Sequence, residues 1–325
     1  MNDLIPQFAA AGLIADPAAV SIQPLTGGVS SEIALIREPG RRSFVAKRAL
    51  SQLRVSEEWY VDLSRNGFEC DYLEYVGHVL PHSVPAVLAR GDGWFAMEYL
   101  DTQEHANWKS LLLSGDVQAI HSARAGETLA RIHQFSYHSS EARKTFHSFD
   151  NFHQLRIDPY FVTTARRHPN LAAAFQEASD QLTQTSECLV HGDFSPKNIL
   201  VSASRLIVLD CEVAWFGDPS FDVAFLLNHL LLKSLYHAPA NRGLADSIEA
   251  FLTSYFTQWP AQRDSLEQRT ARLLPLLLLA RVDGKSPAEY LTNDNRNHIR
   301  KVAPKLIGAP LADITGTFLK SLDLR

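Results

Sequence analysis

Residues 189–201 read LVHGDFSPKNILV, and residues 206–218 read LIVLDCEVAWFGD. The first stretch places an Asp two residues after a His and an Asn five residues after that Asp, between two apolar runs. The second stretch places another Asp at the end of an apolar run. Short apolar runs of this kind predict β-strands. We therefore expect a strand, a loop and a strand over residues 188–201, with polar side chains gathered where the strands end.

These polar side chains, Asp193, Asn198 and Asp210, suit phosphoryl transfer. That reaction depends on positioning and charge neutralisation, so its site needs a carboxylate near the acceptor hydroxyl and oxygen ligands for Mg²⁺. Asp193 can serve the hydroxyl, whereas Asn198 and Asp210 can bind the metal. We expect His191 to support the loop rather than to react. An isolated H-x-D could equally be a packed His and a capping Asp, but the spacing to Asn198 and Asp210 favours catalysis.

The same residues carry a resemblance to a known family. The loop from His191 to Asn198 reads H-G-D-x-x-x-x-N and resembles that of the aminoglycoside phosphotransferase and choline kinase group, small-molecule kinases related to the protein kinases. Protein kinases have Arg in place of the Gly. The metal block of the group is similar to Asp210-Cys211-Glu212, and Gly217-Asp218-Pro219 followed by Phe221-Asp222-Val223-Ala224 also fits the group.

The resemblance implies an α+β, protein-kinase-like bilobal fold. Residues 1–100 would form an N-lobe with a five-stranded antiparallel β-sheet, a Gly-rich phosphate loop and an ATP-binding lysine. Residues 101–325 would form a mainly α-helical C-lobe with the catalytic loop, metal site and acceptor pocket. The implied cofactors are ATP and Mg²⁺, and the implied reaction moves the γ-phosphate to a hydroxyl of a small molecule.

Two further carboxylates take roles from the resemblance. Glu212 would be a second-metal ligand, because choline kinases show a similar Asp-x-Glu, although many relatives have Gly there. Asp222 begins an apolar helix, where a carboxylate can accept backbone N–H groups and favour the helix dipole. In the kinase fold an equivalent Asp also steadies the catalytic loop, so we assign Asp222 to structural support.

The phosphate contacts are expected in the N-terminal half. Apolar and polar residues alternate around Glu38-Pro39-Gly40, which predicts antiparallel strands joined by turns. In the preceding loop Gly27, Gly28 and Ser30 could bring backbone N–H groups close to phosphates, although a plain hairpin would also explain the glycines. Lys47 follows an apolar strand, as the phosphate-pairing lysine of kinases does. The alternative for Lys47 is a solvated charge at a sheet edge.

A carboxylate is needed to hold Lys47, and the helical stretch over residues 55–80 could supply it. Its apolar residues recur at helical spacing, and Glu69 lies at the edge of that face. The resemblance aligns Glu69-x-x-x-Leu73 with the usual pattern of the group, which makes Glu69 the first choice and Glu74 the second, with a plain surface charge as the alternative. Residues 94–100, WFAMEYL, predict a strand that leads to the hinge between lobes. In related kinases the backbone of this segment binds adenine, so Glu98, Tyr99 and Leu100 are candidates for nucleotide contact.

The acceptor pocket is expected in the C-lobe. Residues 139–170 are polar and broken by prolines, and we expect an insertion near the substrate cleft. The C-terminal helices wall the acceptor pocket in this fold, so by analogy Arg281 and Lys285 could hold a substrate carboxylate or phosphate, and Asp283 a hydroxyl. The alternative is that these charges have no role in binding and only solvate the end of a buried helix.

Bulk properties limit the remaining possibilities. A length of 325 residues favours two lobes, and 46% hydrophobic with 21% charged residues is typical of a soluble globular protein. The net charge of −5 argues against nucleic acid as the main partner. Three cysteines without C-x-x-C spacing predict reduced thiols. The N-terminus does not resemble a signal peptide, and the apolar runs are too short to span a bilayer, so we expect a cytoplasmic protein without a membrane partner.

The acceptor could be a small hydroxylated metabolite or an aminoglycoside. The group includes kinases for choline, homoserine and methylthioribose, and an aminoglycoside pocket should be rich in carboxylates. The segment RVDGK offers as many cations as anions, which favours a hydroxylated metabolite. A protein kinase would carry Arg between the His and the Asp and an A-P-E segment, and neither is present. A nucleotide-binding regulatory protein without turnover remains the alternative, although Lys47, Asp193 and Asp210 are all retained.

Overall fold

The computed structural model describes residues 1–325 except 26–30, 50–64, 241 and 325, and it divides into two compact units. The first unit comprises Met1–His105 together with Ile207–Glu212, and the second comprises Ala106–Leu206 together with Val213–Arg325. The short segment that carries Asp210 belongs to the first unit, where the backbone N–H of Val208 donates to the carbonyl of Ser83 at 2.8 Å.

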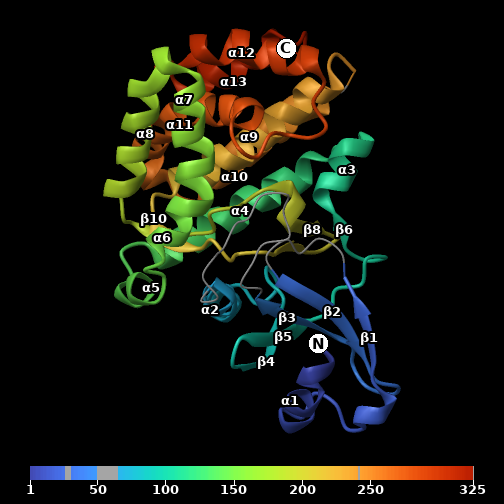
Figure 1. The fold of residues 1–325 in the computed structure, drawn as a ribbon. Helices are drawn as coiled ribbons and strands as arrows, with labels where there is room; N and C mark the ends of the chain where they lie inside the picture. Colours follow the sequence, from blue (N-terminus) through green and yellow to red (C-terminus); the bar gives the residue numbers. More distant parts are fainter. Residues whose placement is uncertain (26–30, 50–64, 241, 325) are drawn as a thin grey trace. The chain divides into compact units, whose positions relative to one another are not determined.

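The first unit is built on a five-stranded antiparallel sheet in the order β1-β2-β3-β5-β4 (Figure 1). Its strands are β1 (Ser21–Pro24), β2 (Ser31–Arg37), β3 (Phe44–Ala49), β4 (Val87–Gly91) and β5 (Trp94–Glu98). The turn between β2 and β3 contains Gly40 at a φ of +77°, a left-handed conformation that glycine adopts without strain. The predicted antiparallel sheet is confirmed.

Side chains that alternate along the strands separate the two faces of this sheet. On one face Ala34, Ile36, Phe44, Ala46, Trp94 and Ala96 form an apolar cluster with residues of the N-terminal helix α1 (Ile5–Ala10). Phe8 of α1 is fully buried there, edge-on to Phe44 and Trp94. Lys47 lies between Ala46 and Arg48 on β3 and therefore points to the other face. Helix α2 (Arg65–Val79) contacts β3, β4 and β5.

The second unit is mainly helical, as predicted (Figure 1). Its longest helices are α4 (Ala119–Ser136), α9 (Ser220–His237), α10 (Gly243–Gln258) and α11 (Arg263–Asp283). Helix α4 packs closely on α10 at Gly126. A Cβ there would lie 2.4 Å from the carbonyl oxygen of Phe251, so only glycine allows this approach. Helix α9 is buried on all sides from Ser220 to Leu235, as expected for a helix with apolar residues all round. Short helices α3 (Trp108–Ser114), α12 (Asn293–Leu306) and α13 (Leu311–Lys320) complete this part.

The segment expected to be an insertion is helical. It contains α5 (Ser140–Thr145), α6 (Phe149–Phe152), a π-helical stretch (His153–Val162) and α7 (Thr163–Arg167), followed by α8 (Ala172–Gln184). Pro159 lies within the π-helical stretch, and such stretches are frequent at functional sites. Arg156 and Tyr160 of this stretch are buried.

Five short strands of the described chain lie outside the first sheet. Strand β7 (Cys188–Val190) pairs antiparallel with β10 (Trp215–Gly217), and β6 (Ala106–Asn107) pairs antiparallel with β8 (Ile199–Val201). Strand β9 (Leu206–Val208) ends shortly before Asp210. Among the helices that the structure describes, none has the length and apolarity needed to cross a bilayer.

Candidate active site

The loop with the H-G-D sequence lies between β7 and β8, as predicted. It leaves β7 at His191 and re-enters sheet structure after a single 3₁₀ turn, Pro196–Asn198. Gly192 has a φ of +76°, and a Cβ there would lie 2.7 Å from the carbonyl oxygen of Val213. Glycine at this position is therefore a steric requirement of this loop.

Asp222, at the start of α9, holds the loop through hydrogen bonds to its backbone. Its carboxylate is fully buried and accepts hydrogen bonds from the backbone N–H groups of His191 at 2.7 Å and Gly192 at 2.9 Å. His133 lies 3.3 Å from the same carboxylate through Nε2 and 2.9 Å from the Tyr255 hydroxyl through Nδ1. The His191 ring accepts from the backbone N–H of Asp193 at 3.1 Å. His191 and Asp222 thus act on the backbone that carries Asp193.

Asp193 is surrounded by donors from its own loop and from the π-helical stretch. Its Oδ2 accepts from the Asn198 side-chain amide at 2.9 Å, and lies 2.8 Å from Lys197 Nζ and 3.1 Å from an Arg156 nitrogen. Arg156 also donates to the carbonyl of Gly192. These cations stabilise the negative charge of a carboxylate that is only 5% exposed.

Two of these residues, Arg156 and Lys197, were not among the predicted site residues. Lys197 has a local signal, because it lies four residues after Asp193 within the same loop. Arg156 has none. It comes from a distant segment and reaches the loop only through the packing of the second unit.

The first unit holds a separate charged group around Lys47. Lys47 Nζ lies 2.6 Å from Glu69 Oε2 of α2 and 3.2 Å from Asp210 Oδ1. Lys47 and Glu69 are 3% and 2% exposed, so this ion pair is buried. Glu74, the second choice as partner, instead pairs with Arg90 at 2.9 Å. Asp210 adopts a φ of +59°, which is uncommon outside glycine and typical of functional positions.

Burial and neighbouring charges act in opposite directions on this group. Burial alone would lower the pKa of Lys47, but the carboxylates of Glu69, Asp210 and Glu212 overcome it and raise that pKa above its ordinary value. Burial raises the pKa of Glu69, and Lys47 opposes this shift. Lys47 is therefore a permanent cation. Cys211 is buried beside the group, its thiol donates to the carbonyl of Glu69 at 3.6 Å, and burial raises its pKa, so it remains a thiol.

The expected nucleotide contacts are only partly within the described chain. Gly27, Gly28 and Ser30 lie outside the described residues. Glu98 ends β5, where its backbone N–H donates to the Ala86 carbonyl at 2.8 Å and its carboxylate lies 3.2 Å from Arg42. Leu100 follows two residues later and is 9% exposed.

The residues expected at the acceptor pocket differ in their surroundings. Arg281 is 8% exposed and contacts the Tyr160 hydroxyl at 3.4 Å and the Ser286 hydroxyl at 2.9 Å. Asp283 lies within an ion-pair network, 2.7 Å from Arg300 and 2.9 Å from His168. Lys285 is exposed, and its backbone N–H donates to the carbonyl of Pro159 at 3.0 Å.

The oxygen donors fit Mg²⁺ bound mainly through a nucleotide. Within the described residues no group of three or more His, Cys, Asp or Glu is arranged to hold a metal, whereas Mg²⁺ in such sites takes one or two carboxylates and completes its shell with phosphates and water. The Asn198 amide nitrogen already donates to Asp193, so its ligand atom would be Oδ1. The Asp210 side chain is 40% exposed and can reach a ligand from solvent.

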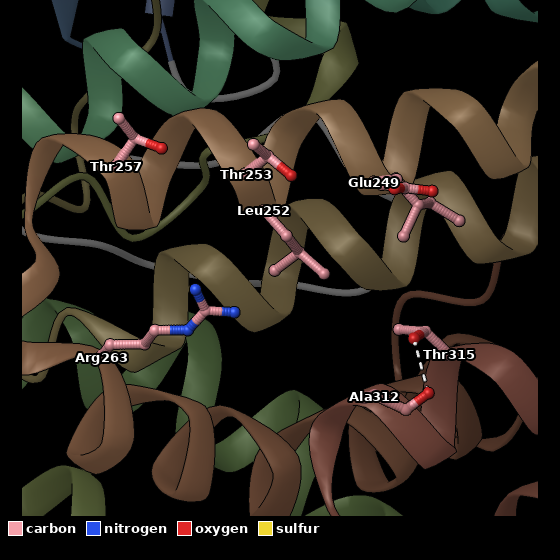
Figure 2. A pocket seen from close by; sticks show the side chains of 8 residues that line it. Glu249, Leu252, Thr253, Thr257, Arg263, Ala312 and Thr315 are labelled. Atoms are coloured by element: carbon pink, nitrogen blue, oxygen red, sulfur yellow. Dashed lines mark hydrogen bonds between the residues drawn. The ribbon is translucent and has the colours of Figure 1, made fainter.

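A groove elsewhere on the second unit does not overlap these residues. Figure 2 shows it between α10 and α13, with Arg263 at the start of α11, and its volume is about 300 Å³. Its lining residues are Ile248, Glu249, Leu252, Thr253, Thr257, Arg263, Ala312 and Thr315. None of the expected site residues lines it, so we do not assign it to the reaction.

Known proteins resemble this chain in sequence and fold. Methylthioribose kinase from Pectobacterium atrosepticum is 27% identical over 222 residues, which cover 60% of this chain and 56% of that kinase. The chain therefore spans little more than half the length of this relative. Choline kinase from Cryptosporidium parvum aligns with a TM-score of 0.58 at 10% identity, over 99% of this chain and 98% of that one. Macrolide 2'-phosphotransferase from Brachybacterium faecium aligns with a TM-score of 0.54 at 18% identity, over 95% and 98%.

These structural matches confirm the protein-kinase-like α+β fold. The sequence also matches the model of the Phosphotransferase enzyme family over residues 21–260, which include Lys47, Glu69, Asp193, Asn198 and Asp210. The chain belongs to this phosphotransferase family.

Proposed function

We propose that this chain transfers the γ-phosphate of ATP to a hydroxyl of a small molecule. The observation that carries the proposal is the buried Lys47–Glu69 ion pair with Asp210 at 3.2 Å. A Lys–Glu pair and a metal-binding Asp are the parts that kinases need to position ATP and Mg²⁺. The relatives named above are two kinases and a phosphotransferase, which supports the same reaction class.

In this proposal Asp193 orients the acceptor hydroxyl and takes its proton. The acceptor oxygen then forms a bond to the γ-phosphorus while the bond to the β–γ bridging oxygen breaks, so that ADP leaves. Arg156 and Lys197 fix Asp193 through Oδ2, and the hydrogen bonds from His191 and Gly192 to Asp222 hold the loop.

In this proposal ATP and Mg²⁺ are bound by residues of the first unit and by Asn198. When bound, Mg²⁺ neutralises charge on the phosphates. Asn198 Oδ1 and Asp210 would hold it, with Glu212 as a further ligand. Lys47 would bind the phosphates together with the loop of Gly27, Gly28 and Ser30. The backbone at Glu98 and Leu100 would contact the adenine.

The acceptor is a small hydroxylated metabolite in this proposal, with an aminoglycoside as the alternative. We place the reaction in the cytoplasm, where ATP is available. The three buried free thiols, Cys70, Cys188 and Cys211, suit that compartment.

The test compares Asp193→Asn with Asp264→Asn, the same change at an exposed position on α11. Thermal shift measures binding of ATP with and without Mg²⁺, and ADP release is measured with a panel of hydroxylated compounds. We expect Asp193→Asn to bind Mg-ATP like the wild type but to lose at least 1,000-fold in turnover, on the order seen for essential acid–base groups. Asp264→Asn should retain turnover. Near-normal turnover by Asp193→Asn would contradict the assignment, and stabilisation by Mg-ATP without ADP release from any acceptor would favour a regulatory protein.

A further inference from the structure

Helix α9 carries a stripe of polar and aromatic residues through the interior of the second unit. Phe225, His229 and Lys233 are four residues apart and therefore share one face of the helix. The rings of Phe225 and His229 lie 5.1 Å apart. His229 is 7% and Lys233 only 1% exposed. In an amphipathic helix the charged residues face solvent, so amphipathicity of α9 does not explain a lysine that is almost fully buried.

Lys233 has neutral contacts only. Its Nζ lies 3.4 Å from the carbonyl oxygen of His229 and 5.2 Å from the centre of the Tyr290 ring. Within the described parts of the chain Lys233 makes no ion pair, and the carboxylate that acts on it through space, that of Glu289, pairs with Lys109. A buried cation without a paired anion is strongly unfavourable, so above pH 7 Lys233 keeps its proton in the folded chain only where a ligand supplies the negative charge.

A second cation, Arg281 of α11, faces the same region. Its contacts are with the Tyr160 hydroxyl, the Tyr160 ring at 6.0 Å, and Ser286, and all are neutral. Burial, together with the charges of Lys109 and Arg281, lowers the pKa of Lys233 to about 7, while Glu289 opposes the shift. Burial, Lys233 and Arg281 also hold the pKa of His229 well below its ordinary value. The region is thus an electropositive interior.

Direct contacts connect this region with Asp193. Arg156, which lies 3.1 Å from Asp193, also lies 5.8 Å from the ring of Phe225 and 5.8 Å from that of Tyr160. Tyr160 in turn contacts Arg281. A molecule whose hydroxyl meets Asp193 could therefore extend along Phe225 and Tyr160 toward Lys233.

We propose that Lys233 and Arg281 bind an anionic group, a carboxylate or a phosphate, of the acceptor whose hydroxyl is presented to Asp193. This inference rests on the proposed function and narrows its substrate class. It replaces the expected grouping of Arg281 with Asp283 and Lys285, because Asp283 is bound by Arg300 and His168. It also excludes a polycationic aminoglycoside, whose ammonium groups would meet buried charges of the same sign.

The test uses Lys233→Met, which keeps the length of the apolar stem, and Lys301→Met as the matched change at an exposed lysine of α12. Titration calorimetry at constant ionic strength measures binding of inorganic phosphate and D-glycerate. ADP release is measured with glycerol, D-glycerate and glycerol 3-phosphate, which share hydroxyls and differ in the anionic group. The two anionic acceptors distinguish a carboxylate from a phosphate. Unliganded melting temperatures are measured for every protein.

We expect Lys233→Met to weaken anion binding by roughly 30-fold or more, as for loss of a buried charge partner, and to raise the unliganded melting temperature. Lys301→Met should change neither. A purely structural Lys233 would give a lower melting temperature in Lys233→Met. Three results would overturn the proposal. They are a lower melting temperature of Lys233→Met, equal anion binding by the wild type and Lys233→Met, and no anion binding by the wild type.

Failure of the proposed function gives a different result. Anion binding could depend on Lys233 while no acceptor gives ADP release. That result would support the anion site and contradict the proposed kinase activity. ADP release with glycerol or a cationic acceptor that is unchanged in Lys233→Met would support the kinase and overturn the anion site.

Discussion

The two units each bury a lysine, and the two lysines have opposite surroundings. Lys47 in the first unit lies between the carboxylates of Glu69 and Asp210, which raise its pKa. Lys233 in the second unit lies beside neutral Tyr290 and His229, the cations that act on it are Lys109 and Arg281, and its pKa falls to about 7. Burial is nearly the same, at 3% and 1% exposure. The neighbouring charges, and not depth alone, therefore decide whether a buried lysine is a permanent cation or one that needs an anionic ligand to keep its proton.

Removing Lys47 should have the largest effect. Lys47→Met leaves Glu69 buried without its cation, so the free energy of unfolding should fall by about 3–5 kcal/mol, and ADP release should be lost. Urea denaturation measures the first effect and a coupled assay the second. Unchanged stability would mean that the ion pair seen here does not form in solution.

Removing both partners should separate stability from activity. In Lys47→Met with Glu69→Leu no charge remains unpaired, and apolar replacements of buried ion pairs are often neutral or stabilising. We expect the double variant to recover most of the stability lost by Lys47→Met and none of the turnover. A double variant as unstable as the single one would show that the loss comes from packing and not from the unpaired carboxylate.

Removing Lys233 should change stability in the other direction. Lys233→Met replaces a buried amine, which costs free energy whether it is an unpaired cation or has lost its proton, with an apolar chain, so the free energy of unfolding of the unliganded protein should rise by about 1–3 kcal/mol. Urea denaturation beside Lys301→Met, where we expect a change within about 0.5 kcal/mol, provides the measurement and its control. Destabilisation by Lys233→Met would remove the contrast between the two lysines.

The pH dependence gives the smallest and most specific effect. Between pH 7 and the ordinary lysine pKa of 10.5, Lys233 is protonated in the unfolded chain and neutral in the folded one. The unfolding free energy should therefore rise with pH in this window, by up to about 1.4 kcal/mol per pH unit. Lys47 adds no slope there, because it is protonated in both states below its ordinary pKa of 10.5; its contribution is lost as the pH rises from that value toward its raised folded pKa. The difference between wild type and Lys233→Met at pH 7, 8 and 9 isolates the effect, and equal slopes would contradict it.

The same pKa predicts how anion binding depends on pH. Lys109 and Arg281 disfavour the protonated form of Lys233, and Glu289 favours it. His229 and Tyr290 are neutral neighbours, because burial lowers the pKa of His229 and raises that of Tyr290. Binding of D-glycerate should weaken above pH 7 as Lys233 loses its proton. Binding that is constant from pH 6 to pH 9 would show that Lys233 does not supply the charge.

The parts of the site that follow strands could be predicted from the sequence. The loop between Cys188 and Val201 and the strands around Gly40 have strong local patterns, because apolar alternation and turn residues fix their conformation. Glu69 was identified correctly as the first choice to pair with Lys47. Its position at the edge of an apolar helical face made it a candidate, and the resemblance of Glu69-x-x-x-Leu73 to the pattern of the family ranked it first.

The parts made by packing between distant segments could not be predicted. Arg156 lies in a π-helical stretch and meets Asp193 only in the folded second unit. Lys233 follows a run of leucines, and no local pattern tells whether such a lysine faces solvent or the interior. Asp283 is held by Arg300, a partner that only helix packing brings near.

The most direct test of phosphotransfer by this chain is to identify the product of the reaction. Wild type and Asp193→Asn are incubated with Mg-ATP and each compound of the hydroxylated panel, and ADP, inorganic phosphate and phosphorylated acceptor are quantified by mass spectrometry and ³¹P NMR. We predict equal amounts of ADP and acceptor phosphate ester with the wild type, and neither with Asp193→Asn. ATP cleaved to inorganic phosphate without an ester, or Mg-ATP bound without turnover, would contradict phosphotransfer by this chain.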